Sequence, residues 1–227
     1  MAKPYAWNRL SKKENFLSQT ATASLGEREA LSEIFLLFSA LFDGPPPAPI
    51  VPKLLMETFP ELRKAVGPTQ LREAIDPADF ATEYEPLFLI PDAMNPLSLY
   101  SNHYTISAEG AGKDLAAELA VLAAALQAPW QKSEFVPGRA YPVTPDHLSV
   151  EFGLLSVLVL RNPAAEIGGK SVFAWADQIA REITQTLEQL HQILQALPRR
   201  HPAYETVIGL ALAYMQTYVQ VEFSTLP

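Results

Sequence analysis

Apolar residues recur at helical spacing through most of this chain, and that spacing restricts the folds open to it. The longest case runs from Ser171 to Leu197, where Pro198 stops it. Its apolar positions alternate four- and three-residue steps: Ala176, Ala180, Ile183, Leu187, Leu190, Leu194 and Leu197. Such a seam is typical of a helix in a bundle. We find no internal repeat and no convincing strand pair, so we predict an all-α, bundle-like fold.

Prolines separate the expected helices. The chain has 20 prolines in 227 residues, and they cluster between the periodic segments. Pro86 stands inside one apolar pattern, so we expect a kink or a helix end near residue 85. The other helices are expected from the Ser24 capping box to the proline-rich turn at 45–49, over 53–65, from Asp76 to the kink, over 113–127, from Pro145 to 162, and from Pro202 onward.

One long connection interrupts the helices. Residues 128–144 contain Pro129, Pro137, Gly138 and Pro142. A connection of this length is often functional or a hinge. We therefore expect a single helical domain, 1–227, with an N-terminal part (1–127), a hinge loop (128–144) and a C-terminal part (145–227). Such a hinge also permits a homodimer that exchanges helices.

Composition excludes several classes of protein. The net charge is −8 and basic residues form only short clusters, which argues against a nucleic-acid partner. The absence of cysteine excludes disulfides, thiolate nucleophiles and cysteine metal sites. The longest apolar stretch, 115–126, contains Glu118 and is too short to span a bilayer. We expect a cytoplasmic protein with no integral membrane segment.

The segment from Thr144 to Phe152 is the most informative for function. Thr144 can cap a helix, Pro145 suits its first position, and Asp146 would lie at the positive end of the helix dipole. We expect Asp146 and His147 on the first turn, at the rim of an apolar body. That arrangement suits binding a charged, partly apolar partner. Glu151, one turn further in, should have a partner if it is buried.

A catalytic role for this segment is an alternative. His147 and Glu151 are four residues apart and would share a helix face, where they could bind a metal or act as an acid–base pair. We favour a hydrogen-bonded structural pair. No phosphate loop, dinucleotide fingerprint or nucleophile elbow is present. We expect no catalysis, no bound metal and no cofactor.

A second set of candidate residues follows the third expected helix. Tyr84, Leu87 and Phe88 are large residues at a helix-to-loop transition, and core and groove roles stay open for Leu87 and Phe88. Tyr84 is the better surface candidate because its hydroxyl needs a polar partner. A groove could also include Pro91, Tyr100 and Tyr104.

These segments resemble one protein family. Residues 83–91 (EYEPLFLIP) followed by 97–104 (LSLYSNHY) resemble the aromatic-x-x-Leu-Phe-x-x-Pro and Tyr-x-Ser-x-Tyr stretch of the TorD/DmsD/NarJ redox-enzyme maturation chaperones. Pro145-Asp146-His147-Leu148 with Glu151-Phe152 resembles their Pro-x-Asp-His…Glu-Leu motif. Three positions depart from the pattern: Thr144 stands where the family has proline, Pro86 is unusual, and Phe152 replaces leucine.

The resemblance implies a cytoplasmic chaperone for a molybdenum enzyme. Such proteins bind the N-terminal signal region, often of twin-arginine type, of the apo-molybdoenzyme catalytic subunit until its molybdopterin cofactor is in place. The family's ligand-facing positions carry over here to Tyr84, Leu87, Phe88, Asp146 and His147, with Glu151 in support.

The residues are compatible with the same mechanism. Our hypothesis is that Asp146 contacts the arginines, because carboxylate and guanidinium form charge-assisted bonds. Tyr84, Leu87 and Phe88 would contact the apolar part of the signal. His147 could orient Asp146 or respond to pH. Two alternatives stay open: a helical scaffold that recognises a folded partner, and a small hydrolase or metal enzyme using His147 and Glu151.

Overall fold

The chain folds as an all-α protein, as predicted. The computed structural model describes residues 25–66, 75–89, 97–101, 115–126 and 144–223. The helices in order are α1 (Leu25–Asp43), α2 (Val51–Lys53), α3 (Phe59–Val66), α4 (Asp79–Tyr84), α6 (Leu115–Ala125), α7 (Leu148–Leu158), α8 (Val172–Ala196) and α9 (Pro202–Phe223). A short 3₁₀ helix, Ala48–Ile50, precedes α2, and π-helical turns cover Leu54–Thr58 and Glu85–Leu89.

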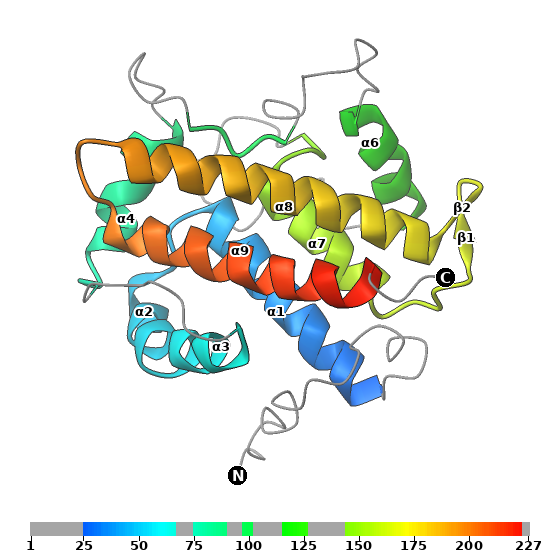
Figure 1. Cartoon of the computed structure of the whole chain (residues 1–227), viewed down its shortest axis with the longest axis horizontal. Helices are drawn as coiled ribbons and strands as arrows, with labels where there is room; N and C mark the ends of the chain where they lie inside the picture. The colour runs from blue at the N-terminus through cyan, green and yellow to red at the C-terminus, as the bar shows by residue number, and fades with distance from the viewer. Residues whose placement is uncertain (1–24, 67–74, 90–96, 102–114, 127–143, 224–227) are drawn as a thin grey trace.

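Helices α8 and α9 form a long antiparallel hairpin that lies across one side of the molecule (Figure 1). The side chain of Ser171 caps α8 by accepting a hydrogen bond from the Ala174 N–H at 3.1 Å. The predicted seam of α8 is buried at Ile183, Leu187 and Leu190. The start of α9 at Pro202 also confirms the prediction.

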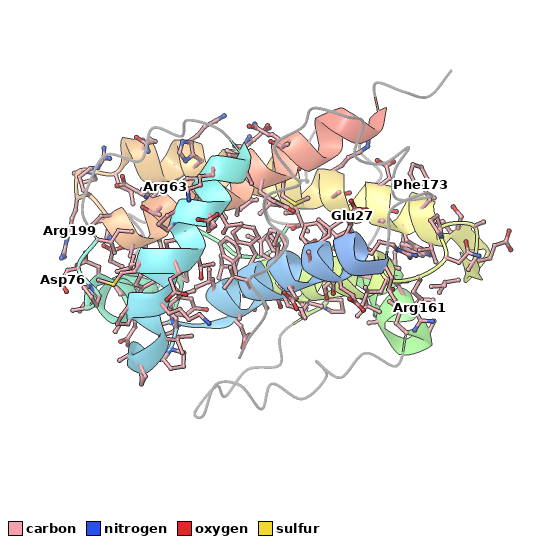
Figure 2. All side chains as sticks on the ribbon, turned by 90° about the horizontal axis from the view of Figure 1, so that it is seen from below. Glu27, Arg63, Asp76, Arg161, Phe173 and Arg199 are labelled. Atoms are coloured by element: carbon pink, nitrogen blue, oxygen red, sulfur yellow. The ribbon has the colours of Figure 1, made fainter. Side chains whose placement is uncertain are left out.

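Helices α1 and α7 pack antiparallel behind this hairpin. Ser39, late in α1, donates to the carbonyl of Ser149, at the start of α7 (2.6 Å). Arg28, early in α1, donates through Nε to the carbonyl of Val159 after α7 (2.7 Å). Figure 2 accordingly shows Glu27 and Arg161 at the same end of the molecule. Around this contact lies an aromatic cluster: Phe35, Phe38, Phe42, Phe152 and, from α9, Tyr214.

The N-terminal helical segments pack against α9. Helices α3 and α4 both contact it, whereas α6 lies near the start of α8 (Figure 1). The α-helical geometry of α4 stops at Tyr84 and continues as a π-helical turn containing Pro86. This agrees with the expected interruption near residue 85, because proline removes one backbone donor from the helix.

Several expected boundaries were wrong. Helix α4 begins at Asp79 because Asp76 accepts from the Ala78 N–H in a preceding turn (2.9 Å). Helix α7 spans a shorter range than 145–162. A strand pair also exists: β1 (Glu166–Ile167) and β2 (Lys170–Ser171) are antiparallel, and Gly168 and Gly169 adopt positive φ in their turn.

Some expectations fall outside the described residues. These are the Ser24 capping position, most of the 128–144 connection, and the irregular stretch around 90–96 and 102–107. In the part of the chain that the structure describes, no helix is both long enough and apolar enough to cross a membrane.

Candidate functional site

Helix α7 begins later than predicted, and His147 is its cap. His147 has an extended backbone (φ −80°, ψ 135°), and its Nδ1 accepts a hydrogen bond from the Ser149 N–H at 3.2 Å. The Ser149 hydroxyl lies 2.8 Å from the same nitrogen. Thr144 instead bonds the Asp146 carboxylate through its hydroxyl, and its carbonyl closes a turn to the His147 N–H (3.0 Å). The capping role expected for Thr144 was therefore wrong, because that side chain stabilises the turn before the helix.

The segment 97–101 crosses the start of α7. Leu148 donates its N–H to the Leu99 carbonyl at 2.8 Å, and Ser101 donates its N–H to the Asp146 carbonyl at 2.9 Å. The ring of Tyr100 meets that of His147 edge-on, with centroids 4.9 Å apart. Two motifs that are distant in sequence therefore form one local structure, and Tyr100 belongs with Asp146 and His147.

Asp146 and His147 are buried, contrary to the expected display at a rim. Their exposed fractions are 4% and 2%, whereas that of Tyr100 is 37%. The 97–101 segment supplies the cover, through its backbone bonds to residues 146 and 148. Periodicity within α7 could not reveal this cover, because it comes from another part of the chain.

Glu151 is fully buried and shares a chain of hydroxyl groups. Ser101 Oγ donates to Glu151 Oε2 at 2.7 Å, and Thr186 Oγ1, from α8, donates to Ser101 Oγ at 2.9 Å. Glu151 Oε1 finds no hydrogen-bond partner among the residues that the structure describes. Burial raises the pKa of Glu151 well above its ordinary 4.5, Ser101 opposes the shift, and the nearby charges of Glu182 and Asp146 add to it.

The partner expected for a buried Glu151 therefore exists, but it is not His147. The carboxyl bonds Ser101, so the favoured His147–Glu151 pair was wrong. No group of three or more histidine, aspartate or glutamate side chains in the described ranges could hold a metal ion.

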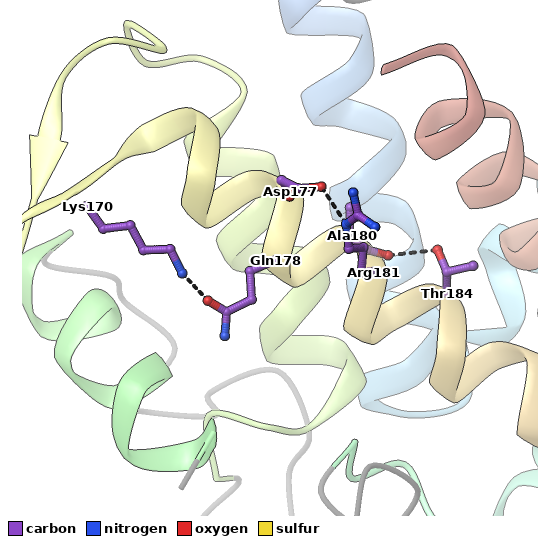
Figure 3. Close-up of polar contacts among 6 residues, drawn as sticks. All are labelled: Lys170, Asp177, Gln178, Ala180, Arg181 and Thr184. Carbon is purple, nitrogen blue, oxygen red and sulfur yellow. Dashed lines mark hydrogen bonds and ion pairs between the residues drawn. The ribbon is translucent and has the colours of Figure 1, made fainter. Parts of the chain in front are cut away.

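Further acidic groups lie beside Glu151. Burial, and then the charge of Glu118 on α6, raise the pKa of Glu182 on α8. Glu118 accepts from Gln178 Nε2 at 3.3 Å, and Lys170 donates to the other end of that amide (Figure 3). None of the ion pairs among the described residues involves Glu118, Asp146, Glu151 or Glu182. We call these four residues the acidic row.

The second candidate set forms a separate aromatic cluster. Tyr84 is only 3% exposed, and its hydroxyl donates to the Phe42 carbonyl at 3.2 Å, so the expected surface role was wrong. Its ring lies 5.3 Å from that of Phe88 and 5.7 Å from that of Tyr204. Leu87 is buried, whereas Phe88 is partly exposed. Of this set, Phe88 is the side chain that a peptide could reach directly.

Glu83, which the sequence analysis did not single out, attaches this cluster to α9. Its Oε2 accepts a hydrogen bond from the Tyr204 N–H at 3.2 Å, on the first turn of α9. Burial raises the pKa of Glu83 to about 7; the backbone bonds to Tyr204 and Ala203 oppose the shift, and Asp79 and Glu205 add to it. A carboxylate from α4 thus satisfies a free donor at a helix N-terminus.

The two groups of candidates connect through the core. The Phe42 ring stacks on Phe152 of α7, with centroids 5.7 Å apart and an interplanar angle of 3°. Because Tyr84 bonds the Phe42 carbonyl, one residue of α1 contacts both groups. Pro91 and Tyr104 lie outside the described residues.

Ser101 and Thr186 were also not singled out. Ser101 stands between aromatic residues in a segment without helical period, and Thr186 is a polar residue on the apolar side of α8. A buried hydroxyl on a helix seam needs a partner, and that requirement was the signal that could have identified Thr186.

Comparison with known proteins identifies the family. Residues 53–201, well over half of the chain, match the nitrate reductase delta subunit family. Neither a curated protein nor a solved structure matches the chain. The matched range includes α4, the 97–101 segment and the acidic row, and it ends just before α9. The chain belongs to the nitrate reductase delta subunit family of NarJ/TorD-type molybdoenzyme maturation chaperones.

Proposed function

We propose that this chain is a non-enzymatic, cytoplasmic chaperone for the apoprotein of a molybdopterin-dependent oxidoreductase. It binds the N-terminal, twin-arginine type signal region and holds the apoprotein until cofactor insertion, before export or assembly. The acidic row beside the start of α7 is the observation that carries this proposal, because it offers carboxylates without a cationic partner among the described residues.

The acidic row is suited to guanidinium groups. A carboxylate that accepts a bidentate arginine gains charge-assisted hydrogen bonds, which are stronger than neutral ones. Asp146 is the member of the row that our proposal places at the arginines, because it lies in the turn before α7, next to the segment that carries the exposed Tyr100. Glu151 lies deeper and supports the turn, since its carboxyl is bonded to Ser101.

The apolar part of the signal would contact aromatic side chains. Among the candidates that the structure describes, Tyr100 is exposed and Phe88 is partly exposed. Tyr84 and Leu87 support Phe88 from within the core instead of forming the contact surface. In this proposal, binding the signal through Asp146 requires local adjustment of the side chains around it, while the backbone bonds of the 97–101 segment to residues 146 and 148 stay in place.

The proposal predicts that Asp146→Asn weakens binding of a synthetic twin-arginine peptide. Charge-assisted bonds contribute about 1.5–3 kcal/mol, so the dissociation constant should rise roughly ten- to 150-fold. Calorimetric titration of the full chain measures this effect. The melting temperature should change little, because asparagine keeps the shape and can still accept the Thr144 hydroxyl.

Asp177→Asn is the matched control, since Asp177 pairs with Arg181 on the outer side of α8 (2.8 Å, Figure 3) and should not affect the peptide. A second peptide with glutamine in place of both arginines should bind weakly to every variant. Equal affinity of wild type and Asp146→Asn would remove Asp146 from the site. Binding of a folded enzyme subunit but of neither peptide would support the scaffold alternative.

A further inference from the structure

Thr186 and Ser101 form a buried connection between α8 and the turn that carries Asp146. The Thr186 hydroxyl donates to Ser101 Oγ, and Ser101 donates its own N–H to the Asp146 carbonyl. Ser101, Thr186 and Glu151 are all fully buried. Three segments of the chain, 97–101, α7 and α8, therefore meet at one serine side chain.

The bond made by Thr186 differs from that of its neighbour Thr184. The Thr184 hydroxyl donates to the Ala180 carbonyl of its own helix at 2.7 Å, as Figure 3 shows. Such local bonds are the ordinary use of a helical threonine. The Thr186 hydroxyl instead reaches a residue 85 positions away in sequence. It therefore orders tertiary structure and not only the helix.

Burial makes the loss of this hydrogen bond unfavourable. A hydroxyl in the core must keep its partner, because an unmatched polar group there destabilises the fold. Ser101 satisfies Thr186 and Glu151 together in the observed position of the 97–101 segment. That position also sets the bond to the Asp146 carbonyl and the bond from Leu148 to Leu99.

From this geometry we infer that Thr186 and Ser101 are positioning residues that hold Asp146 in its binding geometry, Thr186 acting only through Ser101. The functional part of this inference rests on the proposed signal-peptide function. Neither side chain needs to touch the peptide. Their effect on affinity is indirect and requires Asp146 to be present.

Amide hydrogen exchange of the full chain tests the positioning itself, without any peptide. Thr186→Val keeps the side-chain shape but removes the hydroxyl, so the amides of Ser101 and Leu148 should exchange faster than in wild type. Thr186→Ser restores the hydroxyl and should restore slow exchange at both amides. Thr184→Val is the matched control and should leave both amides unchanged. Unchanged exchange in Thr186→Val would overturn the inference.

Peptide titration tests the functional consequence. Thr186→Val should weaken twin-arginine peptide binding about two- to tenfold, the size of one hydrogen bond, and Thr186→Ser should recover it. In a Ser101→Ala background, Thr186→Val should cause no further loss of affinity, because Thr186 acts only through the Ser101 hydroxyl. In an Asp146→Asn background, Thr186→Val should have no effect on affinity.

The two arms separate the possible failures. If Thr186→Val exchanges faster but the wild-type protein binds no peptide, the proposed function is rejected and the positioning role is kept. If the wild-type protein binds the peptide and Thr186→Val binds it with the same affinity, the inference is rejected and the proposed function is kept. A loss of affinity that persists in the Asp146→Asn background would also reject it, since Thr186 would then act by another route.

Discussion

The two ends of α7 are built differently. At its C-terminal end, Arg28 from α1 donates to the Val159 carbonyl at 2.7 Å and also to the Arg161 carbonyl. A cation thus meets free carbonyls at the negative end of the helix dipole. At its N-terminal end, His147 provides the cap, and one oxygen of the buried Glu151 has no hydrogen-bond partner in the described part of the chain.

The difference separates a stabilising arrangement from one compatible with binding. The Arg28 contacts satisfy backbone carbonyls of the kind that every helix leaves unbonded at its C-terminal end. Stabilising the helix end is a sufficient explanation for them. The N-terminal end combines a raised carboxyl pKa, neighbouring acids and an unmatched buried oxygen. Such unfavourable features tend to cluster at functional sites, where binding compensates for them.

Phe152→Ala should give the largest effect, because both ends of α7 depend on its contact with α1. The ring is fully buried against Phe35, Phe38 and Phe42. Removing it should lower the free energy of unfolding by about 3–5 kcal/mol. Urea unfolding followed by circular dichroism measures this loss. A loss below about 1 kcal/mol would mean that α1 and α7 are not held by this cluster.

Arg28→Ala should affect stability alone. Losing the bonds to two carbonyls at the C-terminal end should lower the free energy of unfolding by about 1–2 kcal/mol. Peptide affinity should stay at the wild-type value when it is measured well below the melting temperature. Arg181→Ala, which breaks an exposed ion pair with Asp177, is the matched control and should change stability by about 0–1 kcal/mol. A large loss of peptide affinity in Arg28→Ala would remove the contrast between the two ends.

Glu151→Gln should change the pH dependence of stability. Because burial raises the pKa of Glu151 above its unfolded value of 4.5, its contribution is fully present below about pH 4.5 and declines as pH rises through the folded pKa. Glutamine does not titrate, so the variant should lose less stability than wild type as pH increases. The difference in slope can reach about 1.4 kcal/mol per pH unit. Urea unfolding at a series of pH values measures it.

Glu83→Gln is the matched variant for this measurement. The pKa of Glu83 is raised to about 7, so its effect has the same sign, but it should be complete once the pH exceeds that value. Glutamine can still accept the Tyr204 N–H, so the capping contact of α9 is kept. Parallel curves for wild type and Glu151→Gln at every pH would show that the buried carboxyl does not titrate as expected.

Local pattern was enough to predict the helices and the residues around which the site is built. The start of α8 near Ser171, its seam, the start of α9 at Pro202 and the interruption near Pro86 all depend on residues within about one helical turn of each other. The motifs around Tyr84 and Asp146 also indicated the family from the sequence. Errors at helix starts arose where side chains formed turns instead of caps, as at Thr144 and Asp76.

The sequence by itself determined the all-α fold, because helical spacing and proline breaks can be recognised from residues that are close together in the sequence. Only the tertiary structure decided which of its polar residues are buried and what they bond. Distant segments make four of these contacts: Tyr84 to Phe42, Glu83 to Tyr204, Thr186 to Ser101, and Ser101 to Glu151. No local spacing encodes them, since they depend on how whole helices pack and on the need of each buried polar group for a partner.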